Sequence, residues 1–223
     1  MIPVDDVNLC NYCHVDSGRA DLRQCSGCKS RRYCSKECQR KAWPAHKNGC
    51  QASSKFREEM LVDSELAARN STLSRWISKW QPVIVNAAVD ALNLPNNSAE
   101  DYLVTHSVFI EIGKRPDPPN RSAGMAYKVL RGCVMTNDEW IQEMISRGAS
   151  DEHVEGWGRE DRGPDVARII IHCGDLLRFL YLSLGATRET RRHEDRLAAH
   201  LLNLCWYEVL CREIHSGEFL RGR

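Results

Sequence analysis

The clearest periodic pattern in the chain lies in residues 56–94, where apolar positions recur every three or four residues. The apolar positions on this period are Trp76, Trp80, Val83, Ala87 and Leu92. This spacing lines one face of an α-helix, so the stretch is predicted to be helical. Pro82 is predicted to divide it into two helices, because proline lacks the N–H that a helix interior needs. Residues 51–55 are predicted to form a connector before it, and residues 94–97 to end it.

The middle of the chain changes to strand-like segments separated by turn residues. Residues 102–112 are rich in β-branched and aromatic side chains and are predicted to form a strand, and residues 125–135 a second one. The segment between them, residues 113–124, holds three prolines and is predicted to be a loop. Residues 136–147 are predicted to form a short helix, followed by a polar loop over residues 148–164.

The last third of the chain completes an α+β pattern. Residues 166–184 could be one buried helix, but the isoleucines at 169–171 and the central Gly174–Asp175 favour two strands joined by a tight turn. Residues 190–214 carry leucines at helical spacing with polar residues between them and are predicted to form an amphipathic helix. Residues 54–223 are therefore expected to form a small α+β body, with helices covering one face of an antiparallel sheet.

Composition and the N-terminal residues indicate the cellular compartment of the protein. Hydrophobic residues make up 42% of the chain, which is enough for a core, but no apolar run approaches the roughly 20 residues that span a bilayer. Residues 1–9 form a short tail without the basic start and apolar centre of a secretory signal. We therefore expect an intracellular protein with no membrane partner. Disulfides are rare in such a reducing compartment, so the cysteines are more readily interpreted as metal ligands or core residues.

The cysteines are concentrated near the N-terminus, since seven of the eleven lie in residues 10–50. With one histidine they form four closely spaced pairs: Cys10/Cys13, Cys25/Cys28, Cys34/Cys38 and His46/Cys50. Zinc takes four such ligands in a tetrahedron, so eight ligands make two closed sites with no open position for a substrate water. Ordinary buried cysteines or a disulfide set would not explain four consecutive pairs at these spacings.

This order of ligands resembles the MYND-type zinc finger, as do Tyr33 before Cys34 and the positions of Gln39, Trp43 and His46. The resemblance covers residues 10–50, and its mild departure is a long stretch between the second and third ligands. It implies two zinc ions in an interleaved arrangement, whereas spacing alone would also allow a sequential pairing. The implied ligands are Cys10, Cys13, Cys34 and Cys38 for the first zinc and Cys25, Cys28, His46 and Cys50 for the second. A segment this short needs its metals to fold.

The same resemblance implies a function in protein–protein interaction. MYND fingers dock short proline-rich segments of partner proteins, and a glutamine and a tryptophan on the helical part form the docking surface. Gln39 and Trp43 occupy those positions and, four residues apart, share one helical face. An indole can pack on proline rings, and an amide can hydrogen-bond the peptide backbone. The alternative is that Trp43 only caps the small zinc core.

The finger is basic, which raises nucleic acid as an alternative partner. Residues 10–50 hold nine Lys/Arg against three Asp/Glu. Seven thiolates with two zinc ions would cancel about half of that excess, and no groove-reading helix follows. A solvated basic face that steers acidic partners is the preferred interpretation. The protein is accordingly expected to be an adaptor or regulator that binds protein.

An enzyme is not expected. Some MYND fingers are embedded in SET-domain lysine methyltransferases, where half of the SET domain precedes the finger, whereas nine residues precede Cys10 here. Residues 105–107 and 217–220 resemble SET motifs only superficially. His172 and Cys173 are adjacent, and in a strand they would point to opposite faces rather than form a dyad.

Overall fold

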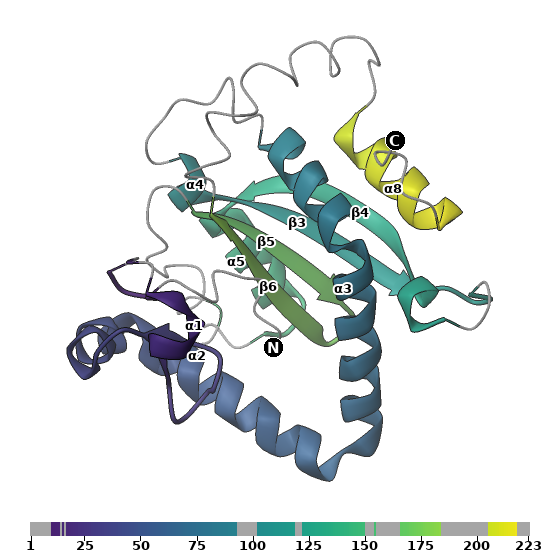
Figure 1. The fold of residues 1–223 in the computed structure, drawn as a ribbon. Coiled ribbons are helices and arrows are strands. Elements are labelled where there is room, and N and C mark those ends of the chain that lie inside the picture. Colours follow the sequence, from purple (N-terminus) through teal and green to yellow (C-terminus); the bar gives the residue numbers. More distant parts are fainter. Residues whose placement is uncertain are drawn as a thin grey trace.

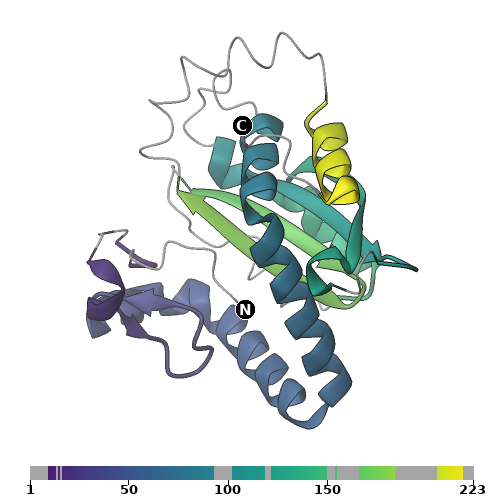
Figure 2. The same cartoon turned by 45° about the vertical axis from the view of Figure 1, so that its right-hand side comes forward.

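The computed structural model describes residues 10–13, 15, 17–92, 102–118, 122–149, 154, 166–183 and 205–217. Its first elements are α1 (Gly18–Asp21), β1 (Arg23–Gln24), β2 (Arg32–Tyr33), α2 (Lys36–Val62) and α3 (Ser64–Ala91). The elements that follow are α4 (Tyr102–Thr105), β3 (His106–Lys114), the 3₁₀ turn η2 (Ala123–Met125), β4 (Tyr127–Thr136), α5 (Asn137–Ser146), β5 (Val166–Cys173), β6 (Leu176–Ser183) and α8 (Trp206–Ser216). The finger lies to one side of the sheet, joined to it through α2 and α3 (Figures 1 and 2).

Helices α2 and α3 form a long hairpin whose corner is Asp63. The backbone N–H of Asp63 donates to the carbonyl of Glu59 and closes α2, while its carboxylate accepts the N–H of Leu66 at 2.9 Å and opens α3. An aspartate in this position satisfies backbone groups that a helix end otherwise leaves unpaired. The first half of α2 thus belongs to the finger, and the second half leads to the corner (Figure 1).

The helical prediction for residues 56–94 is confirmed as far as Ala91, but two of its details are wrong. Residues 51–55 are not a connector, because they lie inside α2, and α3 continues through Pro82. A proline inside a helix costs about 3 kcal/mol. Buried side chains on both sides of Pro82, including the fully buried Trp80 and Ile84, hold α3 in place against that cost. Residues 94–97 lie outside the described residues.

The α+β class is confirmed, although the four-stranded sheet is mixed rather than wholly antiparallel. Its strand order is β4-β3-β5-β6. The pairs β3/β4 and β5/β6 are antiparallel, whereas β3 and β5 run parallel. The predicted hairpin in residues 166–184 is confirmed, with Cys173 opposite Leu176 and Gly174 at a φ of 62° in the turn. The strand predicted over residues 125–135 is β4.

Helices cover both faces of this sheet, so the prediction of a single covered face is wrong. Helices α3 and α8 pack on one face, in a core that includes Trp76, Trp80 and Ile169. Helix α5 packs on the other face around Trp140 and Ile170. Consecutive isoleucines in β5 are buried because alternate side chains of a strand point to opposite faces. The two layers of helices are visible on either side of the strands in Figure 1.

The remaining predictions hold in part. Residues 102–105 form α4 rather than strand, and β3 begins at His106. The helix expected over residues 136–147 is α5, which begins with a capping box between Thr136 and Glu139. The helix expected over residues 190–214 is described only from Trp206, and most of the polar loop at 148–164 lies outside the described residues. Within the described part of the chain, no helix combines the length and apolar character needed to cross a membrane.

Candidate metal centres of the finger

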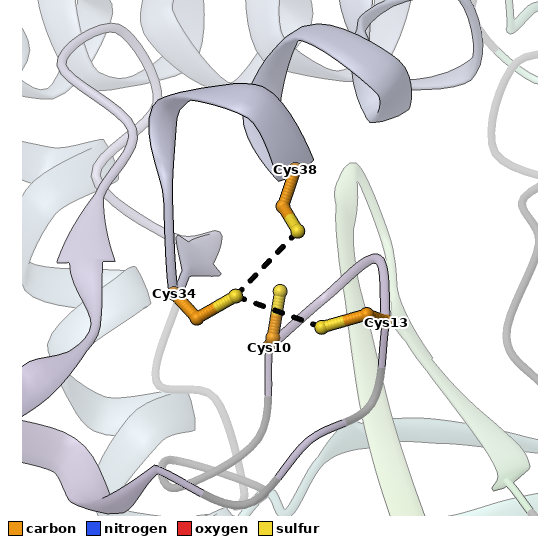
Figure 3. Close-up of side chains that lie close together, drawn as sticks. All are labelled: Cys10, Cys13, Cys34 and Cys38. Atoms are coloured by element: carbon orange, nitrogen blue, oxygen red, sulfur yellow. Dashed lines mark hydrogen bonds between the residues drawn. The ribbon is translucent and has the colours of Figure 1, made fainter.

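Four cysteines from two separate segments meet in the first cluster. The sulfurs of Cys10, Cys13, Cys34 and Cys38 all lie within 4.8 Å of one another. Figure 3 shows the four side chains converging, two from the N-terminal turn and two from the start of α2 and the residues before it. The Cys34 sulfur lies 3.6 Å from that of Cys13 and 3.5 Å from that of Cys38. Ser35 fixes the helix start here, since its hydroxyl accepts the N–H of Cys38 at 3.1 Å.

The second cluster is wholly buried. Its ligand atoms, which also lie within 4.8 Å of one another, belong to Cys25, Cys28, His46 and Cys50. The Cys25 and Cys50 sulfurs are 3.6 Å apart, as are the Cys28 sulfur and His46 Nε2. Gly27 lies in the turn between the first two ligands, and a Cβ there would come within 2.9 Å of the Cys50 sulfur. This turn therefore requires glycine for the close approach of backbone to sulfur.

The two clusters share the same short backbone in the interleaved order that the resemblance implies. Helix α2 sends Cys38 to the first cluster and His46 and Cys50 to the second. The small β1/β2 hairpin, in which Arg23 pairs with Tyr33, joins the two from the other side. Tyr33 is 1% exposed and packs edge-on against His46, with ring centroids 6.1 Å apart. Since the ligands of the two clusters alternate along the finger, loss of one cluster is expected to loosen the other.

Neighbouring groups drive the thiol pKa values in each cluster far apart. Burial would raise the pKa of Cys10, but backbone hydrogen bonds lower it to about 7, whereas the thiols of Cys38 and Cys13 raise the pKa of Cys34 to about 12. In the second cluster burial is outweighed at Cys28, where His46 and Ser30 lower the pKa to about 5. Negative charges crowded this closely disfavour one another, and a divalent cation among them removes the conflict.

The donor sets fit zinc. Four thiolates, or three thiolates and one imidazole, are the ligand sets of structural zinc sites. Soft thiolate ligands and a coordination number of four both favour zinc. The finger therefore carries one Cys₄ site and one Cys₃His site, each suited to one zinc ion. Every ligand position is supplied by protein, so the metals support the fold of the finger rather than activate a water molecule.

Gln39 and Trp43 lie on α2 between the ligands of the two clusters. Trp43 is 42% exposed, and its ring meets that of His46 edge-on with centroids 6.0 Å apart. Gln39 is half-buried, and its side chain is one helical turn from the indole. The indole thus contacts a ligand of the second cluster, while 42% of the Trp43 residue is exposed to solvent.

The finger also contacts the edge of the sheet through strand β6. Arg31 Nη2 donates to the hydroxyl of Tyr181 at 3.2 Å, and its guanidinium lies 5.0 Å from the centre of that ring. A second contact joins α2 to β6, where the Arg178 guanidinium lies 5.4 Å from the centre of the Phe56 ring. Arg178 is buried, which lowers its pKa to about 10. One arginine–aromatic contact thus joins the finger to β6, and a second joins the later part of α2 to the same strand.

Replacing Tyr181 with phenylalanine tests this contact. The variant keeps the ring but loses the hydroxyl, and we expect a cost of about 0.5–1.5 kcal/mol in the free energy of unfolding. Amide hydrogen exchange over residues 28–33 should also become faster, because Arg31 would be held less firmly. Tyr207→Phe is the matched control, since it removes a hydroxyl bonded to the Leu130 carbonyl at 3.0 Å without touching the finger. Unchanged exchange in the finger of the Tyr181 variant would show that the contact does not restrain it.

Sequence reasoning missed the contacts of Arg31 and Tyr181 altogether. The two residues are 150 positions apart, Arg31 is not one of the metal ligands of the finger, and Tyr181 lies outside it. In the sequence Arg31 is one of the nine basic residues of the finger, and Tyr181 is one residue of an apolar strand. His172 and Cys173 behave as predicted: His172 stacks on Phe109 on one face of the sheet, and Cys173 packs into the core on the other.

Comparison with known proteins identifies the family of the finger but finds no solved structure that matches the chain. The MYND finger family matches residues 10–50. Tudor domain-containing protein 1 of Oryzias latipes is 38% identical over 173 residues, covering 67% of this chain and 15% of that protein. Human histone-lysine N-methyltransferase SMYD3 is 38% identical over 56 residues, covering 25% of this chain and 13% of its own. SET domain-containing protein 14 of Caenorhabditis elegans is 43% identical over 57 residues, covering 26% of this chain and 13% of that protein.

Residues 10–50 are a MYND finger, and such a finger is a zinc-binding protein-interaction module. The chain spans only 13–15% of the length of these three relatives. No solved structure matches the chain. The activity of those larger proteins therefore says nothing directly about residues 54–223.

Proposed function

We propose that this protein is an intracellular, non-enzymatic adaptor whose MYND finger docks a short proline-rich segment of a partner protein through Gln39 and Trp43. The observation that carries the proposal is the position of Trp43. Its indole is 42% exposed on a helix whose backbone is fixed by ligands of both clusters. An exposed, rigidly held indole is a suitable surface for proline rings, which stack on aromatic faces at little entropic cost.

The contacts of Trp43 favour docking over a purely structural role. A residue that only caps the zinc core would be buried, as Tyr33 is at 1% exposure. Trp43 instead contacts His46 and remains 42% exposed. Gln39, one turn earlier on the same helix, can offer its amide to a peptide backbone.

A methyltransferase is the alternative from a different class, since two of the relatives bear names of that kind or contain a SET domain. Those similarities cover about a quarter of this chain. The SET-like residues 105–107 lie where α4 passes into β3, and His106 is engaged locally by stacking on Tyr102, with ring centroids 4.2 Å apart. Calorimetry with S-adenosylmethionine discriminates the two functions, because the adaptor should show no binding.

The docking proposal is tested with Trp43→Ala and a library of proline-rich peptides. Loss of the indole–proline contact should weaken binding by about 1–3 kcal/mol, or roughly ten- to hundredfold. Gln39→Ala should cost about 1 kcal/mol, the value of one hydrogen bond. Binding is measured by titration calorimetry on the full chain, with zinc content determined for each variant.

Zinc content separates docking from structure. Both variants should retain the zinc of the unmodified protein, since neither residue belongs to a cluster. If Trp43→Ala releases zinc, the indole is part of the finger core and the docking role is wrong. If the variant keeps its zinc and binds every peptide as the parent does, the partner binds elsewhere.

A further inference from the structure

A basic cleft lies on the opposite edge of the sheet from the finger. It has a volume of about 300 Å³ and is formed by the residue after β3, the start of β4 and the last turns of α8. Four of its lining side chains are basic, namely Arg115, Lys128, Arg212 and His215. Strand β4 is one edge of the sheet, and β6, which contacts the finger, is the other. The cleft is therefore a feature of the body and is separate from the MYND surface.

The cations of this cleft lack carboxylate partners among the described residues. Ion pairs elsewhere in the described part of the chain use other cations, such as Arg131 and Arg147 with Glu143. The nearby acids Asp117 and Glu213 do not line the cleft. Lys128 and Arg212 are exposed at its rim, where they are available to a ligand.

Arg115 holds one wall of the cleft in place. Its guanidinium donates to the carbonyls of Ile214 and His215 at the end of α8, which neutralises the negative end of that helix. Its Nε atom is buried without a hydrogen-bond partner, and burial lowers the pKa of Arg115. An anion in the cleft would give this guanidinium a fully charged acceptor in addition to the two carbonyls.

The floor of the cleft is apolar, which restricts the class of ligand. Val129, Cys211 and Ile214 line it, and among the residues that the structure describes no Phe, Tyr or Trp does. Binding of single-stranded nucleic acid relies on aromatic side chains on which bases stack, and a duplex requires a longer basic track. A volume of about 300 Å³ accommodates one aliphatic side chain, with charged neighbours left at the rim.

We propose that this cleft binds an acidic peptide segment of a partner protein, with one aliphatic side chain on the apolar floor and flanking carboxylates beside Lys128, Arg212 and Arg115. Charge complementarity provides orientation and speed of association, and the floor provides an apolar anchor. The site is independent of proline-rich docking at the finger. A protein with both would hold two different segments at opposite edges of one sheet.

The experiment is fluorescence anisotropy with the full, zinc-loaded chain and the labelled peptide Gly-Glu-Glu-Leu-Glu-Glu-Gly. Binding should weaken when the glutamates are replaced by glutamine, when the leucine is replaced by serine, and when salt is raised. The double variant Lys128→Gln/Arg212→Gln should weaken binding by about tenfold or more, because two charge-assisted contacts are lost. Lys55→Gln/Arg75→Gln removes the same charge from exposed positions elsewhere and should leave binding unchanged.

Several outcomes would overturn the proposal. The acidic peptide would be wrong as a ligand if it failed to bind, or if the glutamine peptide bound equally well. A uridine oligonucleotide that bound instead, and was lost in the Lys128/Arg212 variant, would assign the cleft to nucleic acid. Concentration-dependent self-association in sedimentation, abolished by the same variant, would assign it to a second copy of the chain. Trp43→Ala should retain the acidic peptide in full, so failure of the finger proposal is distinguishable from failure of this one.

Discussion

Replacing Cys34 with serine is expected to remove the zinc ion of the first cluster and to weaken retention of the second. Structural zinc contributes apparent binding free energies of about 10–16 kcal/mol, and a closed site that loses one of four thiolates loses much of this. The effect should spread because Cys38 and His46 lie on one helix and serve different clusters. Zinc per chain, measured by elemental analysis, should fall from two to one or fewer, and the finger should lose amide protection.

Cys205→Ser is the control for this substitution. Cys205 is exposed at the N-terminal end of α8, where serine is a better cap than cysteine, so zinc content and stability should not fall. A purified parent protein that holds a single tightly bound zinc, or none, would contradict the two-site assignment.

Removal of both metals with a chelator tests whether residues 54–223 fold independently of the finger. The buried residues of the finger form a cluster of their own, distinct from the two clusters that flank the sheet. Residues 54–223 are therefore predicted to stay folded when the finger unfolds. Protection from hydrogen exchange should persist in α3 and β3–β6, and a single cooperative loss of all protection would show that the chain is one unit.

Replacing Trp80 with alanine is expected to cost about 3–5 kcal/mol in the free energy of unfolding, as for other large-to-small changes in a core. Trp80 is fully buried, and its indole N–H donates to the Gly124 carbonyl at 2.7 Å, tying α3 to η2. The substitution leaves a cavity and an unpaired carbonyl at once. Urea denaturation monitored by circular dichroism measures the loss.

Two other tryptophan variants serve as controls, each with a smaller expected loss of unfolding free energy. Trp80→Phe keeps most of the volume and should cost less, mainly through the unpaired carbonyl. Trp43→Ala removes an exposed indole and should leave the unfolding free energy of the body unchanged. A loss below about 1 kcal/mol for Trp80→Ala, within the range of surface substitutions, would show that α3 does not anchor the body core.

Local chemistry made some features predictable. The eight metal ligands could be read from spacing because a C-x₂-C turn and an i,i+4 helical pair bring ligands together over a few residues. The β5/β6 hairpin was equally local, since Gly174–Asp175 lies between two apolar strands. The interleaved order of the clusters did not follow from spacing and came from resemblance alone.

Long-range packing decided what the sequence did not reveal. Pro82 is a local helix breaker, but the sheet on which α3 packs overrides it. The parallel pairing of β3 with β5 joins residues about 60 apart, and nothing in either strand identifies its neighbour. The basic cleft likewise requires Arg115, Lys128 and Arg212 from three elements to converge. The corner at Asp63 did carry a signal, because an aspartate before a helical run is a preferred cap, yet Pro82 was the more conspicuous residue.

The contact between Arg31 and Tyr181 has a consequence for the order of events during synthesis. The finger precedes its partner strand by 150 residues, so at about 5–20 residues per second roughly 8–30 seconds separate their emergence from the ribosome. Zinc can bind and α2 can form during this interval, before β6 exists. The finger can then be folded before the sheet forms. The contact between Arg31 and Tyr181 is therefore made late in folding, after β6 has been synthesised.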